Sequence, residues 1–110
     1  MKSLTLKENM DFRRLYYRGK SLADPVLVTY VMKSRAGCCR VGITTGKKIG
    51  CAVLRNRSRR VIRAAFSDLE NQITGDFDFV FVARSRTSCV KMQEVKAAME
   101  KHFKKLGVIK

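Results

Sequence analysis

Arginine recurs at helical spacing in the middle of this sequence. Arg55, Arg59 and Arg63 follow one another at i, i+4 and i+8, with further arginines between them. Each guanidinium presents a planar set of donors that can hold a phosphate through two hydrogen bonds. Like charges four residues apart repel one another within a helix, and no acidic residue offsets that repulsion before Asp68. The row therefore favours a helix that binds an anionic partner over the alternative, a solvated charged face.

The chain as a whole is strongly basic. Its 110 residues contain 24 Lys and Arg against 9 Asp and Glu, a net charge of +15. No acidic residue occurs from Pro25 to Ser67. A solvated surface usually interleaves both signs of charge. The distribution therefore favours nucleic acid as the partner over a membrane surface or an excess of charge without function.

Three aromatic side chains, Phe12, Tyr16 and Tyr30, stand in this basic setting. Phe12 and Tyr16 are four residues apart and would share one face of a helix. Aromatic rings beside basic groups can stack on unpaired bases. Core packing is the alternative, and the residue pattern leaves both open, although the polar tip of tyrosine favours partial exposure.

Other candidate sites do not indicate a self-sufficient enzyme. Gly42–Lys48 looks like a phosphate-binding loop, but it has three residues between its glycines where that motif needs four, and Lys48 stands where a Ser or Thr would hold magnesium. His102, the only histidine, is expected at the surface rather than as a general base. We therefore assign no catalytic residue and no metal site. The cysteines, which fit no zinc pattern and predict reduced thiols, are Cys38, Cys39, Cys51 and Cys89.

The N-terminal half predicts a helix followed by two strands. Thr5–Glu8 has the form of a capping box, and the helix that it would open ends near Arg18, before Gly19. Two β-branched runs over 26–32 and 40–45 predict strands that pair as a hairpin around a turn at 34–37.

The C-terminal half predicts a long helix, a strand and a last helix. Apolar residues recur at helical spacing over 53–73 and again from 88 to 106, where Gly107 would end the helix. The apolar run 78–83 predicts a central strand covered on both faces. No apolar run approaches the roughly 20 residues that span a bilayer, and residues 1–5 lack the apolar core of a signal peptide. We therefore expect the chain to stay in the cytoplasm, as one nucleic-acid-binding domain over 1–110.

The segment Lys47–Phe66, KKIGCAVLRNRSRRVIRAAF, resembles the Arg-Asn-Arg motif in the protein subunits of bacterial ribonuclease P. Asp11-Phe12 with Tyr16, Val41-Gly42-Ile43 and the strand ending at Ala83-Arg84 also fall where that family has counterparts, so the resemblance covers nearly the whole chain. A motif of this length is far more specific than a short pattern. The sequence departs from the family at Cys51, where asparagine is common.

The resemblance implies an α+β fold. The expected architecture is a two-layer α/β sandwich with a four-stranded sheet and three helices, similar to domain IV of elongation factor G. The additional short strand would fall near Ser21-Leu22. The β-α-β crossover would be left-handed, against the usual preference for right-handed connections.

The resemblance also implies a function: removal of the 5′ leader of precursor tRNA to make the mature 5′ end, with an RNA subunit that cleaves the phosphodiester using Mg2+. The leader would lie along a cleft lined by Phe12, Tyr16 and Tyr30. The protein would bind no cofactor itself and would need no membrane and no obligate protein partner. The alternatives are a ribosomal protein or RNA chaperone, and a nuclease acting alone. The residues expected to bind the RNA subunit are Lys47, Lys48, Arg55, Asn56, Arg57, Arg59, Arg60 and Arg63.

Overall fold

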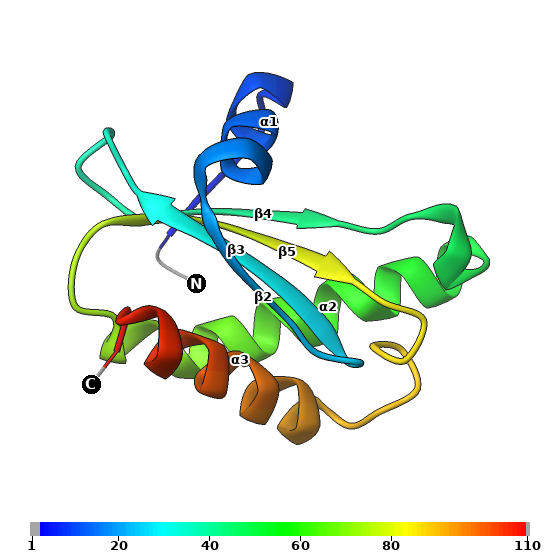
Figure 1. Ribbon diagram of the computed structural model, residues 1–110. Coiled ribbons are helices and arrows are strands. Elements are labelled where there is room, and N and C mark those ends of the chain that lie inside the picture. The colour runs from blue at the N-terminus through cyan, green and yellow to red at the C-terminus, as the bar shows by residue number, and fades with distance from the viewer. Residues whose placement is uncertain (1–2, 110) are drawn as a thin grey trace.

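The structure of the chain, a computed structural model, describes residues 3–109 and, within them, every side chain except that of Lys47. A mixed five-stranded sheet has the strand order β1-β4-β5-β3-β2. Helices α2 and α3 lie on one side of the sheet and α1 lies on the other (Figure 1). The elements in chain order are β1 (Leu4–Thr5), α1 (Asn9–Arg18), β2 (Lys20–Ala23), β3 (Leu27–Lys33), β4 (Arg40–Thr44), the 3-10 turn η1 (Lys47–Ile49), α2 (Ala52–Leu69), the 3-10 turn η2 (Glu70–Gln72), β5 (Phe77–Ala83) and α3 (Met92–Leu106).

The α+β class with three helices is confirmed, with one strand more than expected. The additional strand is β1, whose two residues pair in parallel with β4 at the edge of the sheet. The short strand expected near Ser21-Leu22 is present as β2. Strands β4 and β5 are parallel neighbours joined through α2, which makes the β-α-β unit that the resemblance implied. The left-handed sense of this β-α-β crossover stays a prediction.

The prediction that the strands over 26–32 and 40–45, which are β3 and β4, pair as a hairpin is wrong. Strand β5 lies between β3 and β4, antiparallel to the first and parallel to the second. The hairpin partner of β3 is β2, and the turn between them is closed by two backbone hydrogen bonds between Asp24 and Leu27. The physical reason is burial. The most apolar strand takes the centre of the sheet, where both of its edges are paired and both of its faces are covered.

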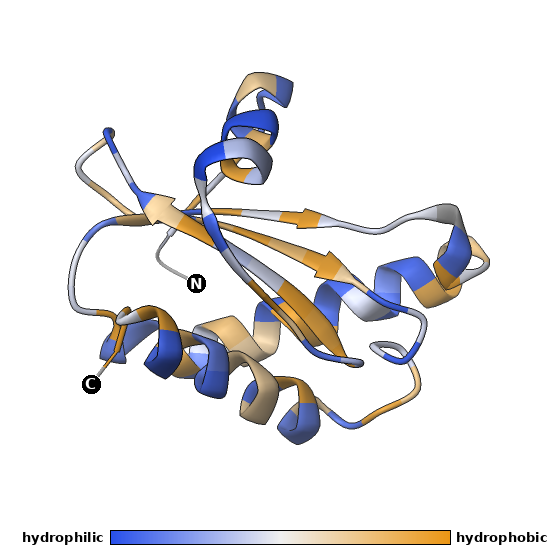
Figure 2. Cartoon of the chain, viewed as in Figure 1, coloured by the Kyte–Doolittle hydropathy of each residue, from blue (hydrophilic) through white to orange (hydrophobic). Residues whose placement is uncertain are grey.

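Strand β5 forms the centre of two hydrophobic clusters. Phe79 and Phe81 face α2 and α3, where the ring of Phe66 lies 5.4 and 5.8 Å from theirs, centroid to centroid. Val80 faces α1 and packs with Leu15. Figure 2 shows β5 as hydrophobic along most of its length, in agreement with burial on both faces. Removing one ring from such a core costs about 3–5 kcal/mol.

Charged side chains attach α1 to the sheet. The buried carboxylate of Asp11 pairs with Arg14 on the same helix and lies 3.6 Å from a guanidinium nitrogen of Arg40. Arg40 also donates to both carboxylate oxygens of Asp78, at 2.9 and 2.7 Å. These hydrogen bonds raise the pKa of Arg40, so the guanidinium stays charged. The ion pairs thus connect α1, β4 and β5.

Two local expectations are corrected. Thr5–Glu8 is not a capping box, because Thr5 lies in β1 and pairs with Val41 of β4, and Glu8 precedes the helix without a side-chain cap. His102 is buried rather than at the surface, and its Nδ1 lies 2.8 Å from the hydroxyl of Thr29. Lysines surround it in sequence, but its position three residues after Met99 places it on the inner face of α3.

The two long helices end close to their expected limits. Regular α-helix in α2 stops at Leu69, and η2 continues the turn as far as Gln72. Gly107 ends α3 with a φ of 76°, a left-handed conformation that glycine adopts without strain. Within residues 3–109, no helix is long and apolar enough to cross a membrane.

Candidate nucleic-acid interface

A hollow of about 510 Å3 lies between α1 and the carboxyl end of β4. Its walls combine two aromatic rings, two guanidinium groups and several small polar side chains. This mixture suits a chain that carries both flat bases and charged phosphates. We call it the α1–β4 hollow, and its lining residues are Asn9, Phe12, Arg13, Tyr16, Ile43, Thr44, Thr45 and Arg59.

Phe12 is held in place by its packing against β4. A Cβ atom built on Gly42 would stand only 2.6 Å from the ring of Phe12, so the ring rests on a strand position where no side chain intervenes. Phe12 is half-buried and packs against the cluster of Leu6, Leu15 and Val80. One part of the ring therefore contributes to the core and another lines the hollow. Core packing is confirmed for this residue, and base stacking stays a prediction.

The two tyrosines differ in position. Tyr16 is 41% exposed and its hydroxyl lies 3.2 Å from that of Thr44 across the hollow. Tyr30 meets Tyr16 edge-on, with ring centroids 4.9 Å apart, and it packs against the core beneath α1. The structure therefore brings Phe12 and Tyr16 to the hollow. Tyr30 supports Tyr16 and does not line the hollow.

Four of the predicted basic-helix residues gather on one exposed face of α2. Asn56, Arg59, Arg60 and Arg63 line a second hollow of about 420 Å3 together with Val53. Within this group, Arg59 donates a hydrogen bond to the side-chain oxygen of Asn56 at 3.3 Å. We call these four residues the α2 basic face. Because Arg59 also lines the α1–β4 hollow, the two surfaces are continuous.

The other predicted residues lie elsewhere. Arg57 points toward the loop after β5, where its Nε donates to the carbonyl oxygen of Ser88 at 2.9 Å. Arg55 is half-buried and lines neither hollow. Lys48 borders a different hollow with Arg84, at the carboxyl ends of β4 and β5. Lys47 has a side chain outside those that the structure describes.

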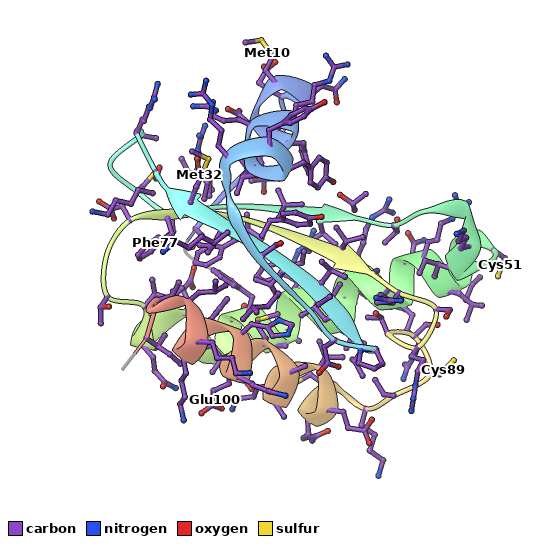
Figure 3. All side chains as sticks on the ribbon, in the orientation of Figure 1. Met10, Met32, Cys51, Phe77, Cys89 and Glu100 are labelled. Atoms are coloured by element: carbon purple, nitrogen blue, oxygen red, sulfur yellow. The ribbon has the colours of Figure 1, made fainter. Side chains whose placement is uncertain are left out.

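The start of α2 has a positive potential. No acidic residue lies in its first turn, and Cys51, which precedes the helix, makes no side-chain cap. The backbone N–H groups of Leu54 and Val53, together with the charge of Arg55, lower the pKa of the exposed Cys51 thiol. The free N–H groups of a helix start attract anions, and arginines add to that attraction. Figure 3 shows Cys51 at this exposed end of the helix.

Sequence reasoning missed several residues of the α1–β4 hollow. Arg13 and Asn9 each lie three residues before a predicted aromatic, and helical spacing could have placed them on the same side of α1. Thr44 and Thr45 could not be found in this way, because they reach the hollow only through the pairing of β4 beside β5.

Across residues 3–109, no three Asp, Glu, His or Cys side chains gather as ligands for a metal, and the four cysteines are free.

Comparison with known proteins agrees with this architecture. The family model of Ribonuclease P matches residues 1–107. The ribonuclease P protein component of Clostridium botulinum (strain Langeland) is 33% identical over 109 residues, which are 98% of each chain. The same component from Listeria innocua is 38% identical over 107 residues, which cover 96% of this chain and 89% of that relative.

Solved structures show the same similarity. The RNase P protein of Staphylococcus aureus superimposes with a TM-score of 0.84 at 31% identity, covering 99% of this chain and 100% of that one. The RNase P protein of Thermotoga maritima gives a TM-score of 0.79 at 27% identity, covering 96% and 97%. With a family model that spans nearly the whole chain and relatives that match from end to end, the chain belongs to the ribonuclease P family of protein components.

Proposed function

We propose that the chain is the RNA-binding subunit of a ribonuclease P ribonucleoprotein. In this proposal the α2 basic face binds the RNA subunit, and the α1–β4 hollow binds the 5′ leader of precursor tRNA. The observation that carries the proposal is the position of Arg59, which lines both surfaces. One protein can thus hold the catalytic RNA and guide the substrate strand that enters it.

The α1–β4 hollow has the groups that a single strand needs. Bases would stack on Phe12 and Tyr16, which contributes about 1–3 kcal/mol per base and tolerates any base. Arg13 and Arg59 would meet the phosphates of the same strand. The buried hydroxyl of Thr45 has no hydrogen-bond partner among the described side chains, so it is available to a polar group of a bound strand. Tolerance of any base suits precursor tRNAs whose leaders differ in sequence.

The protein's role in cleavage would be to bind and position. In this proposal the RNA subunit holds the Mg2+ that the reaction requires and cleaves the phosphodiester. The arginines and amide of the α2 basic face would neutralise phosphates of the RNA subunit and release their counterions. No membrane and no second protein has a part in this proposal, and the cytoplasm is its location.

A cleavage assay tests the division of labour. Protein alone, with Mg2+ and precursor tRNA, should give no product, and addition of the ribonuclease P RNA should give cleavage at the mature 5′ end. Cleavage by rigorously RNA-free protein would instead identify a nuclease acting alone. Copurification with ribosomal RNA, in place of one long RNA of ribonuclease P type, would favour a ribosomal protein.

Salt dependence tests the α2 basic face. Arg59→Ala and Arg60→Ala should each weaken binding of the RNA subunit and reduce the log–log salt slope by somewhat less than one, because each removes about one phosphate contact. Lys101→Ala, which removes an exposed charge from α3, is the matched control and should leave the slope unchanged. Equal effects at all three positions would mean that the protein attracts RNA only through its net charge.

A further inference from the structure

Another hollow lies on the face of α1 that points away from the sheet. It measures about 740 Å3 and includes one residue from outside the helix, in the loop between β3 and β4. Figure 1 shows this loop rising from the sheet on the same side as α1. We call it the outer α1 hollow, and its lining residues are Met10, Arg13, Arg14, Tyr17, Arg18 and Arg35.

The outer α1 hollow combines exposed apolar groups with positive charge. Tyr17 is 88% exposed and Met10 is 76% exposed, so neither side chain contributes to the core. Met10 stands at the outer end of α1 and points away from the sheet (Figure 3). Such large exposed apolar groups beside one another mark an interaction surface more often than a solvated one.

Most of the arginines around Tyr17 form no ion pair with another residue of 3–109. Arg14 pairs with Asp11, but Arg13, Arg18 and Arg35 form no salt bridge within the part of the chain that the structure describes. Three uncompensated guanidinium groups around an exposed ring suit a partner that offers both phosphates and flat bases. Unpaired RNA has this chemistry, because its bases are free to stack.

Arg13 connects this surface to the substrate site. It lines the outer α1 hollow and also the α1–β4 hollow, on the other side of the same helix. A strand held between Phe12 and Tyr16 can therefore continue over α1 with a phosphate on Arg13, and its next bases then reach Tyr17.

We propose that the outer α1 hollow binds the distal nucleotides of the precursor-tRNA leader, those beyond the part held in the α1–β4 hollow. A base would stack on Tyr17, and Arg18 and Arg35 would meet the phosphates on either side. The proposal rests on the function proposed above. It adds a second, leader-length-dependent contact, so precursors with long leaders bind more tightly than those with short ones.

Leader length provides the test. The affinity of the reconstituted holoenzyme is measured for precursor tRNAs with leaders of about 4 and about 12 nucleotides, within the range of site sizes of single-strand binding domains. Tyr17→Ala should weaken binding of the long-leader precursor about 5-fold or more, the effect of one lost stacked base, and leave the short-leader precursor unchanged. Tyr17→Phe keeps the ring and should behave as the wild type. Because Tyr17 is exposed, these variants should fold normally.

Two results would overturn the proposal. One is equal affinity of wild type and Tyr17→Ala for the long-leader precursor. The other is weaker assembly with the RNA subunit together with equal losses for both leader lengths, which would place the RNA subunit on this surface. A different variant, Tyr16→Ala, tests the function proposed above. It should weaken binding of both precursors if the α1–β4 hollow holds the proximal leader.

Discussion

Arg57 and Arg60 lie three residues apart on α2, yet their surroundings differ. Arg57 donates to the carbonyl of Ser88, whereas Arg60 lies on the exposed α2 basic face. Both were predicted to bind RNA because both belong to the same sequence motif. The sequence could not assign Arg57 its contact with the backbone, because residues 57 and 88 are brought together only by the packing of the loop after β5.

Alanine at these two positions should separate the two roles. Arg57→Ala should lower the free energy of unfolding by about 1 kcal/mol, because it removes a hydrogen bond that holds the loop. Arg60→Ala should leave stability unchanged and weaken binding of the RNA subunit. Urea unfolding of both variants, with RNA-subunit affinity measured in parallel, checks this. The assignment fails if Arg57→Ala unfolds at the same urea concentration as wild type.

His102 should make the stability of the protein depend on pH. Burial lowers the pKa of this imidazole, as do the charges of Lys101 and Lys105, while Asp24 acts in the opposite direction. In the unfolded chain the pKa is about 6.5, so below that pH the unfolded state binds the proton more readily. The stability that neutral His102 contributes is therefore present above about pH 6.5, and it is lost as the pH falls through the lower pKa of the folded state.

The comparison with a non-titrating side chain tests this. The melting temperature of the wild type should fall between about pH 7.5 and about pH 5.5, where ordinary carboxylates remain ionised. His102→Gln can still hydrogen-bond to Thr29. Its melting temperature should be lower than that of the wild type at the upper pH and should change less over the same range. Parallel curves for the two proteins would show that His102 does not titrate differently in the folded and unfolded states.

Among the elements, β4 and α1 determine the shape of the α1–β4 hollow through the contact between Gly42 and Phe12. A methyl group at Gly42 would stand 2.6 Å from the ring, so Gly42→Ala should displace Phe12 and α1. The expected result is weaker binding of leader-bearing precursor tRNA, with a moderate fall in melting temperature because overpacking strains the cluster of Leu6, Leu15 and Val80. Fluorescence or NMR of the aromatic rings would report the displacement.

Gly46 offers the matched control for this change. A Cβ atom there meets nothing within 4 Å, so Gly46→Ala should change leader binding and stability much less than Gly42→Ala does. If the two alanine variants bind leader-bearing precursor equally well, the position of Phe12 does not determine leader binding.

Elements with strong periodicity were predicted well, and their pairing was not. The apolar positions Ile62, Phe66 and Leu69 of α2 recur at the spacing of one helix face, and all three are buried. Strand β2, with the sequence KSLA, is short, polar and mostly exposed, so neither alternation nor hydropathy indicates it. Only the family resemblance predicted β2; from the residue pattern alone, the strand over 40–45 looked like the partner of β3. The true pairing follows from how the whole molecule buries β5.

For the whole molecule, the sequence predicted the partner class and the basic helix, because charge and motif are properties of the chain itself. It placed Phe12 and Tyr16 together because helical spacing does so. It did not predict that Arg59 would join them, since that requires side chains of α1 and α2, which lie on opposite sides of the sheet, to line one hollow beside β4. Continuity between the aromatic hollow and the α2 basic face is thus a property of the tertiary structure.

The central claim is that the α1–β4 hollow binds the leader, and the most direct measurement compares two substrates. Holoenzymes carrying wild-type protein, Tyr16→Ala or Tyr16→Phe are tested for affinity toward leader-bearing precursor tRNA and toward mature tRNA. Tyr16→Ala should weaken binding of the precursor about 5-fold or more and change binding of mature tRNA little, while Tyr16→Phe retains the stacking ring. Equal losses of affinity for both tRNAs, with a large drop in melting temperature, would contradict the account.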